Sequence, residues 1–150
     1  MAMIQAVSWT IPFSAAHRLY RHESRSRFVH GHNYTVTIAV EPRNGNAIPS
    51  VMYDYAKAET MYRKWIANRL DHTLILAADD PLLDIANGRA DMGLRSFPIA
   101  GEPTAGNIAT MLMRCEPAIE LADLGLRVQA ITVSPTAEYQ ATEYNENHKS

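Results

Sequence analysis

Residues 30–40 read HGHNYTVTIAV, a run in which apolar and polar side chains alternate after the two histidines. Val36, Ile38 and Val40 fall on one side of an extended chain, and β-branched residues dominate the run. This alternation predicts a strand from Tyr34 to Val40, with the HGH residues at its head.

Three further strands are predicted by the same reasoning. Residues 4–13 place tryptophan, isoleucine and phenylalanine on one face of an extended chain. Another strand follows Gly125 and stops at Pro135, and a last short one spans Tyr139–Tyr144 before a polar tail.

Two helices are predicted between these strands. Asp54 is well placed to cap the first, which runs to about Leu70 and repeats apolar residues at helical spacing. The second covers about residues 106–122. Because Pro117 lies inside it, either a kink occurs there or the helix breaks near Cys115.

Three segments lack such periodicity. Residues 18–29 predict a long polar loop, residues 42–46 a turn, and residues 73–103 a long connection with one short helical turn. The order β-β-α-α-β-β indicates an α+β fold, with a four-stranded antiparallel sheet and both helices on one face. Since no repeat or linker interrupts the chain, residues 1–150 are expected to form one domain.

The composition is that of an ordinary globular protein. The chain has 150 residues, 47% of them hydrophobic, and a net charge of -2, which favours no nucleic-acid partner. No apolar run approaches the ~20 residues that cross a bilayer, and the N-terminus lacks the pattern of a signal peptide. We therefore expect a cytoplasmic protein without a membrane partner. One cysteine, Cys115, excludes an intrachain disulfide.

Arginines cluster in the predicted loop, at positions Arg18, Arg21, Arg25 and Arg27. Such a cluster is usually a solvated loop. The alternative is that it contacts an anionic group of a substrate, and the sequence leaves both interpretations open.

The HGH residues bring two imidazoles to the same side of the chain. In an extended segment, residues two apart point to one face, so His30 and His32 can reach a single ion. His17 lies at the end of the preceding strand and is placed to supply a third ligand. Three histidine nitrogens with a fourth position open are the arrangement of a catalytic zinc site. The alternative for each histidine is a packed or solvent-facing ring.

Several motifs follow one another in a distinctive order: FSAAHRL at 13–19, HGHNYTVTI at 30–38, YDY at 53–55, LDH at 70–72 and PT at 103–104. This order resembles the 6-pyruvoyl-tetrahydropterin synthase and 6-carboxytetrahydropterin synthase family over roughly residues 5–144. The resemblance implies a T-fold subunit in barrel rings, trimers or hexamers, with active sites between subunits. It also implies that zinc is held by His17, His30 and His32.

The resemblance further implies a catalytic pair, Asp71 and His72. A carboxylate that orients an imidazole fixes its tautomer and raises its basicity, so that the histidine can carry protons. Because adjacent side chains do not easily bond each other, we expect both residues to have partners elsewhere. The alternative is that Asp71 ends a helix and His72 is a polar loop residue.

The chain departs from that family at the general base. Family enzymes carry a cysteine a few residues before HGH, where this chain has Ser26 at the spacing of many bacterial members and Ser24 at that of animal members. A serine hydroxyl is a far more reluctant base than a thiol unless a metal or another base activates it. Cys115 is expected to pack in the core instead.

Two glutamates of the family are also replaced. Gly106 stands for the glutamate of the PTxEN signature, and Pro135 for the glutamate of the VxET element that binds the pterin ring. Thr104 and Thr136 remain from these elements and are the candidate substrate-binding residues.

The resemblance therefore implies a zinc-dependent lyase that acts on dihydroneopterin triphosphate or a related reduced pterin. The departures keep two alternatives open. One is a lyase or hydrolase acting on a different small heterocycle, and the other is a catalytically silent, zinc- or ligand-binding member of the family. The expected cofactor is Zn²⁺, and the expected assembly is a homo-oligomer.

Overall fold

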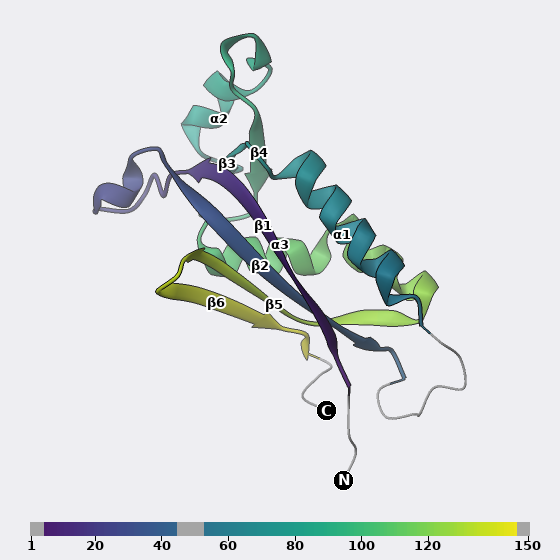
Figure 1. Cartoon of the computed structure of the whole chain (residues 1–150). Helices are drawn as coiled ribbons and strands as arrows, with labels where there is room; N and C mark the ends of the chain where they lie inside the picture. The colour runs from purple at the N-terminus through teal and green to yellow at the C-terminus, as the bar shows by residue number, and fades with distance from the viewer. Residues whose placement is uncertain (1–4, 45–52, 147–150) are drawn as a thin grey trace.

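A computed structural model describes residues 5–44 and 53–146 of the chain (Figure 1). Its strands are β1 Val7–His17, β2 His30–Pro42, β3 Leu74–Ala77, β4 Ser96–Ile99, β5 Leu126–Thr136 and β6 Tyr139–Tyr144. Its α-helices are α1 Tyr55–Arg69, α2 Pro81–Ala86, α3 Ala105–Arg114 and α4 Glu116–Glu120. Short 3₁₀ turns cover Arg25–Arg27, Ala90–Met92 and Leu121–Leu124.

The six strands of the described residues form one mixed sheet in the order β4-β3-β1-β2-β5-β6. The pairs β1–β2, β2–β5 and β5–β6 are antiparallel, as predicted. The pairs β1–β3 and β3–β4 are parallel, so the prediction of a four-stranded, wholly antiparallel sheet is wrong. The α+β class is confirmed.

The two additional strands lie in residues 73–103, where a long connection was predicted. Strand β3 has the sequence LILA, and all four of its side chains are buried. A strand covered on both faces reads as a continuous apolar run rather than as an alternation, and four residues are too few to reveal a period. The parallel edge of the sheet was therefore not recognisable from local pattern alone.

Helix α1 begins and ends close to the predicted positions. The side chain of Asp54 accepts a hydrogen bond from the backbone N–H of Lys57, which caps the first turn. The second predicted helix is broken: α3 ends at Arg114, and Cys115 adopts an extended conformation before α4 begins. Pro117 occupies the first turn of α4, where its missing N–H costs nothing.

The main core lies between the sheet and the helices α1 and α3, which cross one face of it (Figure 1). Alternate residues of β1 and β2 face this core, among them Ile11, Phe13, Val36 and Ile38. Helix α2 packs elsewhere, in a small cluster with Leu74 and Leu76. Because these two side chains alternate with Ile75 of the main core, α2 covers the opposite face of the sheet.

Strand β1 extends four residues further than the predicted strand and includes His17. Arg43 and Asn44 form the turn predicted after β2, while positions 45 and 46 of that prediction lie outside the described residues. No helix within residues 5–44 and 53–146 is long and apolar enough to cross a membrane.

Candidate metal centre

The three histidines meet at one end of the β1–β2 ladder. In the antiparallel register His17 lies directly opposite His30, and Ala15 lies opposite His32. Their side chains therefore share the face that carries the main core, beyond Phe13 and Tyr34. One ring nitrogen from each histidine lies within 4.8 Å of the other two.

Backbone carbonyls fix the tautomers of two of these rings. Nδ1 of His17 lies 2.8 Å from the carbonyl oxygen of Pro103, and Nδ1 of His30 lies 2.7 Å from that of Phe28. A carbonyl oxygen can only accept, so each Nδ1 carries the proton and donates it. In both neutral rings the lone pair is then on Nε2.

The two Nε2 atoms face each other at 3.0 Å. With both protons on Nδ1, neither nitrogen can donate to the other, and two lone pairs point at the same small volume. Two Zn–N bonds at a tetrahedral angle would separate their nitrogens by about 3.4 Å, close to this arrangement. A cation between the rings, with His32 as a third ligand, satisfies the cluster, so the residues fit a zinc ion.

Burial favours the neutral form of His17 and of His32. It lowers the pKa of His17 to about 4, with a smaller contribution from the neighbouring His30 and His32 and against the hydrogen bond to Pro103. Burial also lowers the pKa of His32, again with a contribution from His30. A neutral imidazole is the form that binds a metal, so the environment favours coordination near neutral pH.

A family model described as 6-pyruvoyl tetrahydropterin synthase matches residues 6–147. The chain belongs to this family. A 6-carboxy-5,6,7,8-tetrahydropterin synthase from Rickettsia conorii is 35% identical over 104 residues, which cover 68% of this chain and 72% of the relative. The corresponding protein of Rickettsia felis is equally similar over the same length.

Solved structures share the fold. An uncharacterised protein from Wolinella succinogenes superposes with a TM-score of 0.80 at 19% identity, over 97% of this chain and 100% of that one. The 6-pyruvoyl tetrahydropterin synthase of Caenorhabditis elegans superposes with a TM-score of 0.61 at 18% identity, over 97% of this chain and 98% of that one. These likenesses establish the family's α+β fold for this chain.

The side chains of Asp71 and His72 contact each other, contrary to the expectation that adjacent side chains do not easily bond. Nδ1 of His72 lies 2.9 Å from Oδ2 of Asp71. The reason is the backbone of His72, whose φ of 61° is left-handed and turns the ring back towards its neighbour. The other oxygen of Asp71 accepts from the backbone N–H of Ser14 at 2.9 Å, and this bond and the one from His72 lower the pKa of Asp71.

A cavity of about 510 Å³ is lined by His72 together with residues at the same end of β1 and β2. Its polar lining includes Ser14, Asn33 and Arg95, and the side chain of His72 is 79% exposed. Because Ser14 and Asn33 alternate with the positions that carry the histidines, the cavity lies on the face of the sheet opposite the three histidine rings, although residue His32 forms part of its lining. The complete lining is Ser14, Ala15, Ala16, Val29, Gly31, His32, Asn33, His72, Thr73, Leu74, Gly93, Leu94 and Arg95.

The other predicted site residues do not line this cavity. Ser26 is half-buried in the 3₁₀ turn Arg25–Arg27, where its backbone carbonyl accepts from Leu19. The hydroxyl of Thr104 caps α3 by accepting from Asn107 at 3.1 Å. Thr136 is exposed at the end of β5.

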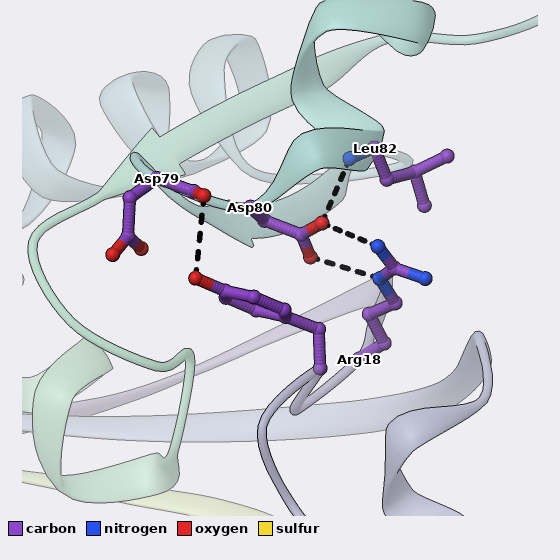
Figure 2. Close-up of polar contacts among 5 residues, drawn as sticks. Arg18, Asp79, Asp80 and Leu82 are labelled. Atoms are coloured by element: carbon purple, nitrogen blue, oxygen red, sulfur yellow. Dashed lines mark hydrogen bonds and ion pairs between the residues drawn. The ribbon is translucent and has the colours of Figure 1, made fainter.

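Two arginines of the predicted cluster, Arg18 and Arg21, pair with carboxylates of the chain. Arg18 forms a bidentate salt bridge with the buried carboxylate of Asp80, with Nε 2.9 Å from Oδ2 (Figure 2). Arg21 pairs with Asp79 on the surface. Both arginines are thus neutralised within the chain and do not stand free for an anion. Figure 2 also shows that Asp80 caps α2 through the N–H of Leu82.

The sequence predictions missed the two groups that orient the histidine rings. They are the backbone carbonyls of Pro103 and Phe28, and every residue has a carbonyl. No residue type marks such a partner. The PT motif at 103–104 was visible, but it served only as a family motif with Thr104 as a candidate substrate-binding residue, and it did not indicate a contact with His17.

Proposed function

We propose that the protein is a zinc-dependent lyase of the pterin-synthase type that acts on dihydroneopterin triphosphate or a related reduced pterin. The carrying observation is the convergence of the His17 and His30 lone pairs, 3.0 Å apart, beside His32. Family membership and the relatives named 6-carboxy-5,6,7,8-tetrahydropterin synthase support the substrate class.

His17, His30 and His32 would hold the metal. When bound, zinc polarises oxygen groups of a substrate and makes neighbouring protons more acidic. The chain's own contribution is proton transfer by His72. Its Nδ1 donates to Asp71, which leaves the lone pair of Nε2 to accept a proton from a substrate in the cavity. Asp71 in turn is held by the backbone N–H of Ser14.

Metal analysis tests the first half of this proposal. Purified wild-type protein should carry about one zinc ion per chain, and His30→Ala should carry much less. His22→Ala is the matched control, because His22 is an exposed histidine of the loop before β2 whose Nδ1 accepts a hydrogen bond from the backbone N–H of Ser24. Equal zinc contents in wild type and His30→Ala would overturn the metal site.

Turnover tests the second half. Zinc-loaded protein should consume dihydroneopterin triphosphate, with the products identified by mass spectrometry, and the metal-free protein should not. Zero turnover with zinc fully bound would overturn the assignment of this substrate.

A second candidate is a silent binding subunit or an enzyme for a different small heterocycle. It is favoured by Ser26, whose hydroxyl has no hydrogen-bond partner among the described residues that would activate it as a base. Ser26→Cys distinguishes the candidates. A gain of turnover on the pterin indicates a pocket that still binds it, whereas no gain, with zinc bound, favours the second candidate.

The assembly and location follow the family resemblance. We infer a cytoplasmic homo-oligomer, a trimer or a hexamer. Sedimentation equilibrium measures the mass directly, and a monomeric mass at working concentration would contradict this part of the proposal.

A further inference from the structure

The connection between β4 and α3 lies against the candidate metal centre. Its residue Pro103 is buried and points its carbonyl at Nδ1 of His17, 2.8 Å away, across 86 positions of sequence. This carbonyl favours the tautomer of His17 that carries its proton on Nδ1, which leaves the lone pair on Nε2. Whatever holds the connection in place also determines the direction of that lone pair.

The side chain of Asn107 holds it. Nδ2 of Asn107 donates to the backbone oxygen of Glu102 at 2.7 Å, and the N–H of Thr104 donates to the same oxygen at 2.8 Å. The N–H of Asn107 returns a bond to the hydroxyl of Thr104 at 3.1 Å. Three bonds thus enclose Pro103 between its two neighbours, and Asn107 supplies two of the donors, one from its side chain and one from its backbone.

Gly101 makes room for this arrangement. Its φ is +75°, a left-handed conformation that side chains rarely adopt, and a Cβ there would lie 3.0 Å from Nδ2 of Asn107. The turn therefore approaches the amide of Asn107 as closely as a glycine permits. The geometry is specific to holding this backbone, because an ordinary helix cap needs only Thr104.

We propose that Asn107 is a positioning residue for the metal centre. It acts through the backbone of Glu102 and Pro103 to keep His17 in the Nδ1–H tautomer, with Nε2 turned towards His30. The inference rests on the proposed function, since it concerns how the three histidines are prepared for a metal.

Two variants test it. Asn107→Ala removes the side chain, and Asn107→Asp removes only the N–H donors while placing a carboxylate in the first turn of α3, where negative charge favours the helix. We expect both variants to bind zinc at least about tenfold more weakly than wild type. This is the typical effect of losing a hydrogen-bond partner of a metal ligand. A merely structural role predicts that Asn107→Asp binds normally.

A second readout needs no metal. Imidazole ¹⁵N chemical shifts in the metal-free protein should show His17 protonated at Nδ1 in wild type and a mixture of tautomers in both variants. Asp54→Ala is the matched control: it removes the cap of α1, so it lowers stability, yet it should leave zinc affinity and the His17 tautomer unchanged.

The outcomes separate the two proposals. Wild-type protein that binds no zinc overturns the proposed function, while the tautomer readout still decides the role of Asn107. Wild-type protein that binds zinc, with both Asn107 variants equally tight and His17 unchanged, overturns the positioning role. Loss of affinity in Asp54→Ala as well would also overturn it, because general destabilisation would then explain the effect.

Discussion

The backbone conformation of His72 constrains where its imidazole ring lies. Among the described residues His72 alone combines a side chain with a positive φ, and its N–H donates to the carbonyl of Ser14. A left-handed histidine costs about 1 kcal/mol or more and persists where surrounding contacts hold it. In this conformation the ring contacts Asp71, and His72 also lines the cavity.

The role of His72 is testable by His72→Asn. Asparagine tolerates a left-handed backbone, so the fold should be retained while the imidazole is lost. If the proposed proton transfer is correct, turnover of the pterin should fall about 10²- to 10⁴-fold. Zinc content should stay at the wild-type level, because His72 is not one of the three clustered histidines. Kinetics and metal analysis on the same preparation check both parts, and unchanged turnover would exclude His72 as the base.

At the scale of elements, an ion pair joins the end of β1 to the start of α2. Arg18 follows His17 directly, and its partner Asp80 is 2% exposed (Figure 2). Asp80 also caps α2, so one carboxylate satisfies a guanidinium and a helix N-terminus. The arrangement ties the loop after β1 to the parallel edge of the sheet.

Breaking this pair should cost more than breaking its neighbour. Asp80→Asn leaves Arg18 without its counter-charge in a largely buried setting, and we expect a loss of about 2–3 kcal/mol in the free energy of unfolding. Asp79→Asn is the control, because the Arg21–Asp79 pair is exposed and such pairs contribute little. Urea unfolding of the two variants measures the difference, and equal losses would contradict the structural distinction between them.

The same pair predicts a pH dependence. The bonds from Arg18 chiefly hold the pKa of Asp80 below its usual value. Since the unfolded state binds the proton more tightly, this stabilisation is present above the unfolded pKa of about 3.9 and is lost as the pH falls through the folded pKa. In acid, wild type should therefore lose stability more steeply than Asp80→Asn. Parallel acid titrations of the two proteins, followed by circular dichroism, would show identical curves if the pair contributed nothing.

At the scale of the whole molecule, metal binding and folding should be linked. The three histidines come from both β1 and β2, and their nitrogens converge only in the folded chain. At a free zinc concentration one hundredfold above Kd the folded state gains about 2.7 kcal/mol. For a chain of this length that corresponds to a rise in Tm of about 5–10 °C.

Differential scanning calorimetry with and without zinc checks this linkage. A chelator should reverse the rise, and His30→Ala should show little of it. An equal rise in wild type and His30→Ala would mean that zinc binds elsewhere on the chain.

Local pattern alone determined the elements that carry the site. The alternation in residues 30–40 predicted β2, Asp54 marked the start of α1, and the spacing of His30 and His32 put both rings on one face. These features depend on neighbours within a few positions, which is the range over which side-chain periodicity is readable. The family resemblance rested on such local motifs and is confirmed.

Only the tertiary structure decided the rest. The parallel pairing of β3 and β4, the carbonyl of Pro103 at His17 and the turned-back ring of His72 were not predictable from their own segments. The physical reason is that each depends on backbone groups brought together over long sequence distances. Backbone N–H and C=O groups are common to nearly all residues, so no residue type records which of them will meet.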